Sequence, residues 1–136
     1  MPRILIIDDE KAIRNTLRDI LQYEKFEVDE AADGLEGLKK AEGGNFDLVL
    51  CDIKMPKMDG VEVLEAVKKI KPEIPMVMIS GHGDMETAIN TMRLGEFDYI
   101  SKPPDLNRLL NTVRNAIKKK QLVVENKILK RIVGKK

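Results

Sequence analysis

The sequence predicts an α/β fold, in which a doubly wound parallel sheet of five strands is covered by helices on both faces. Short runs of β-forming residues alternate five times with segments of helical periodicity in the first 117 residues. Three of the runs are apolar on both faces, as strands between two helical layers must be. The predicted strands are Arg3–Ile7, Glu27–Ala31, Leu48–Cys51, Pro75–Ile79 and Phe97–Ile100. Because crossovers between parallel strands are right-handed, few topologies remain, and we expect the strand order 2-1-3-4-5.

A helix is predicted after each strand, because apolar residues there recur at helical spacing. The stripe after the second strand is the weakest. In chain order the stripes are Ile13, Leu17, Ile20 and Leu21; Leu35, Leu38 and Ala41; Val61, Leu64 and Val67; Met85, Ala88, Ile89 and Met92; and Leu106, Leu109, Leu110, Val113 and Ile117. Packed against the sheet, these stripes would complete a three-layer domain.

The composition is that of an ordinary globular domain. A chain of 136 residues is long enough for one domain and a short extension, and it has 43% hydrophobic and 35% charged residues. Its single cysteine, Cys51, excludes a disulfide framework, and a single histidine, His82, argues against a zinc site. The apolar run at the N-terminus is too short for a signal peptide or a membrane span. We therefore expect a soluble, cytoplasmic protein that does not associate with membranes.

Charge is distributed unevenly along the chain. Residues 118–136 contain eight Lys or Arg and one acid, Glu125, for a net charge of +7, whereas residues 1–117 have a net charge of −6. An acidic body binds nucleic acid poorly, so we expect no direct nucleic-acid binding by residues 1–117. Apolar residues continue at roughly helical spacing at Leu122, Val124, Ile128, Leu129 and Ile132. We therefore divide the chain into a domain of residues 1–117 and a basic extension of the last helix, residues 118–136.

Polar residues gather where four of the five predicted strands end. The first strand is followed by Asp8-Asp9-Glu10, the third by Asp52, the fourth by Ser80 and the fifth by Ser101-Lys102-Pro103. In the expected order these four strands are neighbours, and ligands bind at the carboxyl ends of the strands in open α/β sheets. We therefore expect five polar side chains to meet at one edge of the sheet, those of Asp8, Asp9, Asp52, Ser80 and Lys102.

Several carboxylates, an ammonium group and a hydroxyl group in one small cleft favour phosphoryl chemistry with a metal ion. Adjacent carboxylates repel one another unless a cation neutralises them, and a hard site of oxygen atoms suits Mg²⁺. The metal ion, Lys102 and the Ser80 hydroxyl would position and neutralise a phosphoryl group. A carboxylate can itself be the nucleophile, and Asp52 is the natural choice because it lies between the acidic pair and Lys102.

Taken together and in order, these residues resemble the receiver domains of two-component response regulators. The resemblance covers roughly residues 2–117 and implies the flavodoxin-like fold of receivers. The matching residues are Asp8-Asp9-Glu10, Asp52, Met55-Pro56, Asp59-Gly60, Ser80-Gly81, Tyr99 and Lys102-Pro103. Any one of these elements is weak evidence, but their combination in this order is highly specific.

The resemblance implies a role for each matching residue. Asp52 would be the phosphoacceptor, and Mg²⁺ would be held by Asp8, Asp9, Asp52 and the backbone carbonyl of Lys54. Lys102 would bind the phosphoryl group, with a cis peptide bond before Pro103, and Ser80 and Tyr99 would form the switch pair. The implied partner is a sensor histidine kinase, and a receiver of this kind is a signalling switch rather than an enzyme.

A narrower resemblance is to receivers of NtrC- and NtrX-type regulators, which activate transcription. It rests on Ser80-Gly81-His82-Gly83, Thr87-Ala88, Met92, Leu94-Gly95 and Phe97-Asp98-Tyr99-Ile100, and on Leu122 to Lys127, which is similar to the start of a helical linker. In such regulators an ATPase domain and a DNA-binding domain follow the receiver. The resemblance implies a homodimer on activation and, if the chain is a fragment, an output domain in cis.

Three other functions remain open at this stage. A stand-alone receiver would act as an adaptor through protein contacts. A Mg²⁺-dependent phosphatase with an aspartyl nucleophile would have its two aspartates separated by one residue, whereas Asp8 and Asp9 are adjacent. A flavin or nucleotide binder would need a phosphate-binding loop rich in Gly, Ser or Thr and stacking aromatic residues, but the chain has Asp8-Asp9-Glu10 at that point and an aromatic content of 4%.

Overall fold

The computed structural model describes residues 1–81, 98–102 and 104–133. In these residues five strands form one parallel sheet in the order β2-β1-β3-β4-β5, so the predicted sheet and its order are confirmed. The strands are β1 (Arg3–Ile7), β2 (Glu27–Ala31), β3 (Leu48–Asp52), β4 (Met76–Ser80) and β5 (Asp98–Ser101).

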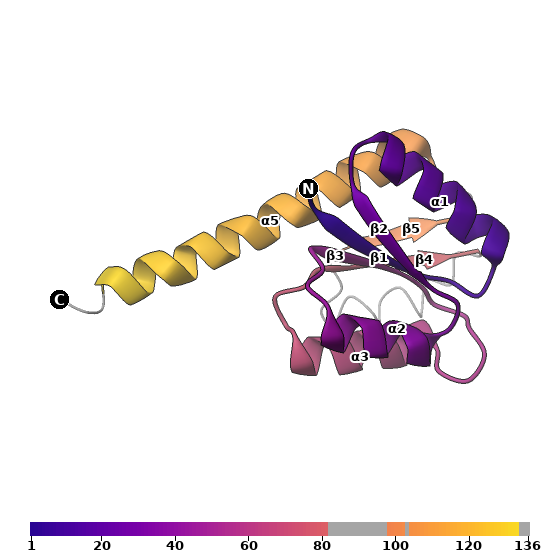
Figure 1. The fold of residues 1–136 in the computed structure, drawn as a ribbon, viewed down its shortest axis with the longest axis horizontal. Helices are drawn as coiled ribbons and strands as arrows, with labels where there is room; N and C mark the ends of the chain where they lie inside the picture. The colour runs from indigo at the N-terminus through magenta and orange to yellow at the C-terminus, as the bar shows by residue number, and fades with distance from the viewer. Residues whose placement is uncertain (82–97, 103, 134–136) are drawn as a thin grey trace.

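Helices cover both faces of the sheet. The described helices are α1 (Lys11–Tyr23), α2 (Gly34–Gly43), α3 (Gly60–Ile70) and α5 (Leu106–Val133). Helices α1 and α5 lie on one face, and α2 and α3 lie on the other (Figure 1). The helix predicted around Met85, Ala88, Ile89 and Met92 falls outside the described residues.

The core consists of two apolar layers, one on each side of the sheet. In β1, Ile4 and Ile6 face the layer beneath α1 and α5, whereas Leu5 and Ile7 face the layer beneath α2 and α3. All four side chains are at most 1% exposed. This alternation explains why the central strands are apolar at every position, and the prediction of strands buried on both faces is confirmed.

Helix α2 packs against the sheet partly through glycine residues. Leu35 was expected on the buried face but is 50% exposed, and the buried residues are Gly34, Gly37 and Ala41. A Cβ atom on Gly37 would collide with the side chain of Ile7. Two residues of the predicted stripe do contribute to the core, since Ala41 is buried and Leu38 packs against the same layer. The close approach of Gly37 to β1 is not detected by a pattern of apolar periodicity.

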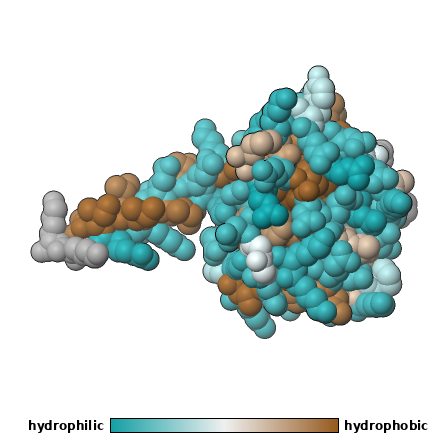
Figure 2. Space-filling model, viewed as in Figure 1, coloured by the Kyte–Doolittle hydropathy of each residue, from teal (hydrophilic) through white to brown (hydrophobic). Residues whose placement is uncertain are grey.

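Helix α5 continues well past the body of the domain. Residues on its first half pack into the core, but every residue from 121 to 133 is exposed. Figure 1 shows this second half projecting away from the sheet, and Figure 2 shows apolar side chains gathered along one side of it. The predicted extension of the last helix is thus confirmed over the described residues, although Leu106, at its start, is exposed rather than buried.

No helix in the described part of the chain combines the length and apolar character needed to cross a membrane.

Candidate functional site

The carboxyl ends of the strands bring together the residues that the sequence singled out. Asp8 follows β1, Asp52 and Ser80 end β3 and β4, and Lys102 follows β5. The exposed fractions of Asp8, Asp52 and Ser80 are 1%, 5% and 3%. The Nζ atom of Lys102 lies 2.9 Å from Asp8 Oδ2 and 3.4 Å from Asp52 Oδ2. The acidic residues and the lysine therefore form one compact, largely buried cluster.

Four carboxylates at this edge are close enough to share a cation. One carboxylate oxygen from each of Asp8, Asp9, Glu10 and Asp52 lies within 4.8 Å of the others. Asp8 Oδ1 accepts a hydrogen bond from the Glu10 backbone N–H at 2.9 Å. Asp8 Oδ2 is buried, and the Lys102 ammonium lies 2.9 Å from it. A buried carboxylate in a set of hard oxygen donors fits Mg²⁺.

Burial and mutual repulsion alter the protonation of this cluster. Burial, followed by the negative charge of Asp8, raises the pKa of Asp52 to about 6, against the opposing effect of Lys102. Burial lowers the pKa of Lys102, but contact with Asp8 and the charges of Asp52 and Glu10 outweigh it, so that the pKa lies above its usual value. Lys102 therefore remains a cation at neutral pH, whereas Asp52 binds a proton more readily than an exposed aspartate.

The loop between β3 and α3 fixes the carboxyl end of β3. Gly60 N–H donates to Ile53 C=O at 2.8 Å, and a Cβ atom on Gly60 would collide with the backbone oxygen of Asp52. Asp59 caps α3, since its side chain accepts from the Glu62 N–H at 2.9 Å and the Glu62 side chain accepts from the Asp59 N–H at 3.3 Å. The start of α3 thus packs closely against the backbone of Asp52.

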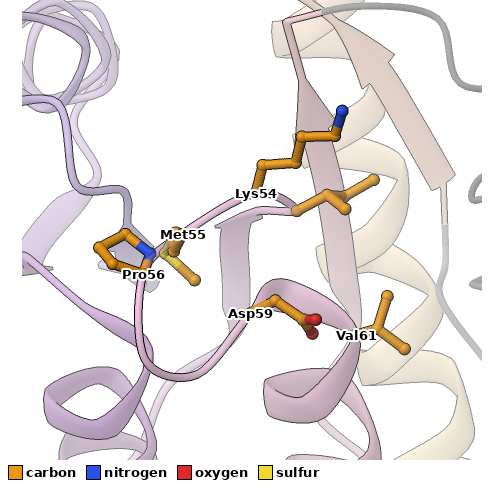
Figure 3. A pocket seen from close by; sticks show the side chains of 6 residues that line it. Lys54, Met55, Pro56, Asp59 and Val61 are labelled. Carbon is orange, nitrogen blue, oxygen red and sulfur yellow. The ribbon is translucent and has the colours of Figure 1, made fainter.

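A cavity of about 480 Å³ opens beside this loop. Figure 3 shows Lys54 and Asp59 on two sides of the opening, with Met55 and Pro56 at the bend of the loop. The cavity is lined by Ile53, Lys54, Met55, Pro56, Asp59 and Val61. Lys54 is exposed, and the role predicted for its backbone carbonyl as a metal ligand stays a prediction.

Two further predicted residues, Ser80 and Tyr99, lie on β4 and β5. Ser80 C=O accepts the Lys102 N–H at 2.7 Å, which ties the end of β4 to the lysine. Tyr99 is half-buried and packs against the apolar layer beneath α2 and α3. Pro103 and His82 lie outside the described residues, and the cis peptide bond before Pro103 stays a prediction.

The comparisons with known proteins agree with this arrangement. A family model described as the response regulator receiver domain matches residues 4–114. The chain belongs to this family. Receiver domains are signalling switches of two-component systems, and the phosphorylation-dependent function expected from the sequence is consistent with that membership.

Relatives and solved structures support the narrower resemblance as well. The receiver is 39% identical over 129 residues to a putative NtrX-like response regulator of Rickettsia bellii, covering 93% of this chain and 27% of that protein. NtrX of Brucella abortus superposes with a TM-score of 0.89 at 37% identity, over 95% of this chain and 30% of that one. A receiver domain protein of Clostridium thermocellum superposes with a TM-score of 0.86 at 37% identity, over 90% and 99% of the two chains. Similarity to regulators of the NtrX type is therefore confirmed, and the chain spans 26% to 28% of the length of curated relatives.

Two features of the receiver site were not predicted from the sequence. Glu10 joins the carboxylate cluster, although only Asp8 and Asp9 were expected to do so besides Asp52. Arg14 Nη1 donates to Asp8 C=O at 2.6 Å and so holds the backbone at the end of β1. The position of Glu10 directly after the two aspartates was a signal for the first feature, whereas the second depends on how α1 lies against β1.

The raised pKa of Asp52 predicts that Asp52→Asn stabilises the metal-free receiver at neutral pH. The folded-state pKa of about 6 exceeds the unfolded value of about 4, so ionising this carboxyl lowers the stability of the wild type as pH rises through that window. We expect Asp52→Asn to raise the free energy of unfolding by roughly 1–3 kcal/mol at pH 7.5 and by almost nothing near pH 4. Urea denaturation in EDTA across this range measures the difference, and a benefit independent of pH would contradict the explanation.

Proposed function

We propose that Asp52 accepts a phosphoryl group from a sensor histidine kinase in a Mg²⁺-dependent reaction. The observation that carries the proposal is the buried Asp52 carboxylate within 3.4 Å of the Lys102 ammonium and inside the carboxylate cluster. Asp8, Asp9, Asp52 and the backbone carbonyl of Lys54 would hold the metal ion. When bound, Mg²⁺ would neutralise charge on the carboxylates and on the phosphoryl oxygens.

The chain's own residues supply the nucleophile and the positive charge. A carboxylate oxygen of Asp52 attacks phosphorus, the P–N bond of the kinase phosphohistidine breaks, and its electron pair leaves with the imidazole. Lys102 would stay protonated and attract the phosphoryl oxygens, and Ser80 at the end of β4 would donate a hydrogen bond to them. Because the pKa of Asp52 is about 6, the nucleophilic carboxylate is the main form at pH 7.5.

Phosphorylation would change the charge at the end of β3 and with it the surface near β5. The phosphoryl group has a charge of about −1.5 to −2 at neutral pH, in place of the single negative charge of the carboxylate, and it adds hydrogen-bond acceptors. In the proposed switch, Ser80 moves toward the phosphoryl group and Tyr99 turns inward, which alters the surface formed by β5 and α5. This change favours a homodimer or a contact with an output domain.

We also propose that residues 1–117 form the receiver and that residues 118–136 begin a linker. The family match over residues 4–114 and the exposure of residues 121–133 support this division. Relatives are named as transcriptional regulators, so the output in a longer chain would be transcription activation. The receiver would then act in the cytoplasm as a switch, not as an enzyme with a substrate of its own.

The experiment is intact mass spectrometry after incubation with Mg²⁺ and acetyl phosphate. We expect one added phosphoryl group on the wild type, none with EDTA, and none on Asp52→Asn. Asp59→Asn is the matched control, because Asp59 is a nearby acid that caps α3 and keeps an acceptor oxygen after substitution. Phosphorylation that persists in Asp52→Asn, or that needs no Mg²⁺, would refute the proposal.

A further inference from the structure

Within the described chain, three cationic side chains of α5 anchor the helix to three different parts of the body. They are spaced six residues apart. Arg108 Nη2 donates to Tyr99 C=O in β5 at 2.7 Å, Arg114 Nη2 donates to Glu24 at the end of α1 at 2.8 Å, and Lys120 Nζ donates to Asp47 Oδ1 at 3.1 Å and to Phe46 C=O at 3.2 Å, just before β3. The helix is thus attached by polar contacts as well as by its apolar face.

The spacing of these anchors constrains how the helix can move. Six residues of an α-helix advance it by about 9 Å and rotate it by about 240°, so Arg108, Arg114 and Lys120 point in directions about 120° apart. Together they span about 18 Å of the helix axis. Rotation of α5 about its axis, or a tilt away from the body, would break at least one of the three contacts.

The anchor at Lys120 is the most enclosed. Its side chain is 20% exposed, and that of Asp47 is 33% exposed. Asp47 is itself fixed to the start of β1, because its Oδ2 accepts the Arg3 N–H at 2.8 Å and its own N–H donates to Arg3 C=O at 2.8 Å. The Arg3 guanidinium lies 4.9 Å from the centre of the Phe46 ring, which steadies the same loop. Lys120 therefore attaches the helix to the loop before β3, which is itself hydrogen-bonded to the start of β1.

Lys120 also marks the point where the helix leaves the body. It is partly buried, whereas each residue from 121 to 133 is exposed. We propose that Lys120 and Asp47 form a clamp that fixes the direction in which residues 121–133 leave the receiver. Figure 1 shows the projecting half of α5 that this clamp would orient.

A small movement at the clamp becomes a larger one at the end of the helix. Residues 121–133 extend about 20 Å beyond Lys120, compared with about 18 Å between Arg108 and Lys120. A displacement of about 1 Å at Lys120 relative to Arg108 therefore moves Val133 by about 2 Å. Any segment that the helix carries would be presented in one orientation relative to the carboxylate site.

The clamp should affect orientation more than stability. Ion pairs that remain in contact with solvent contribute little to the free energy of folding, and the apolar face of α5 keeps the helix bound to the sheet. Lys120→Met removes the ammonium group and keeps most of the aliphatic stem. Lys118→Met is the matched control, because Lys118 is exposed and lies half a turn earlier on the same helix.

The test is the distance distribution between spin labels on the body and on the projecting helix, at Glu42→Cys and Asn126→Cys, measured by pulsed electron resonance. Cys51 is fully buried and stays unlabelled in the folded protein. We expect Lys120→Met to widen the distribution by at least about twofold, because the overhang magnifies any motion at the clamp. Lys118→Met should leave the width unchanged, and Lys120→Arg should restore it.

Two further measurements distinguish a loss of the clamp from a general loss of structure in the receiver. The distance distribution between labels within the body, at Glu42→Cys and Asp19→Cys, should have the same width in Lys120→Met as in the protein with Lys120. Far-ultraviolet circular dichroism should show the same helix content for both proteins. An unchanged width in Lys120→Met, equal widening in Lys118→Met, or widening of the body pair would each overturn the proposal.

Discussion

Asp8→Asn should weaken Mg²⁺ binding by at least about tenfold, the largest effect that we expect from a single substitution among the carboxylates. The reason is the position of Asp8, which is 1% exposed and lies within the cluster of four carboxylates. An amide at this position removes one negative charge from the cluster and weakens the ligand. Isothermal titration calorimetry with MgCl₂ at pH 7.5 measures the change.

Two other variants test whether the effect on Mg²⁺ binding depends on the position of the charge and on its sign. Glu10→Gln removes the same charge from a side chain that is 60% exposed, so its effect should be several-fold smaller. Lys102→Met should strengthen Mg²⁺ binding, because the ammonium group 2.9 Å from Asp8 Oδ2 repels a second cation. Equal losses for Asp8→Asn and Glu10→Gln would contradict the central role of Asp8.

The second large effect is expected from Gly60→Ala, which should destabilise the receiver by about 1–3 kcal/mol. A Cβ atom on Gly60 would collide with the backbone oxygen of Asp52 and would lie 2.8 Å from the Cα atom of Ile53. These are backbone atoms at the end of a buried strand, so they cannot move aside as a flexible side chain would. Urea denaturation measures the loss, and the extent of phosphorylation reports any displacement of Asp52.

Gly43→Ala is the matched control for this substitution. Gly43 is the last residue of α2, and a Cβ atom there would meet no atom of the described residues within 4 Å. Alanine has the higher helix propensity, so this change should be neutral or slightly stabilising. If both substitutions cost the same free energy, backbone flexibility would explain the loss better than the contact with Asp52.

The strands could be predicted almost to the residue because burial on both faces leaves a strong signal. The limits of β1 and β2 agree with the predicted runs, and β3 ends one residue later, at Asp52. The exposure of Leu35 could not be predicted in this way, because the close packing of Gly37 on Ile7 is a property of the assembled layers. Periodicity records apolar residues and does not record where a small residue permits close contact.

The meeting of Asp8, Asp52 and Lys102 was predictable from topology alone. Once the strand order is known, the ends of neighbouring parallel strands must lie together. The Lys120–Asp47 contact had no comparable signal, since it joins a loop to a helix 73 positions away. Contacts of long flexible side chains across such distances depend on the final packing, which residue types and spacing do not specify.

Strand β3 separates two parts of the receiver that partners would use. Asp47, which holds the projecting helix, precedes the strand, and Asp52 ends it. The five residues of β3 extend about 17 Å, so the two positions lie at opposite poles of the domain. A partner at the carboxylates and a partner on the projecting helix would therefore contact opposite ends of β3.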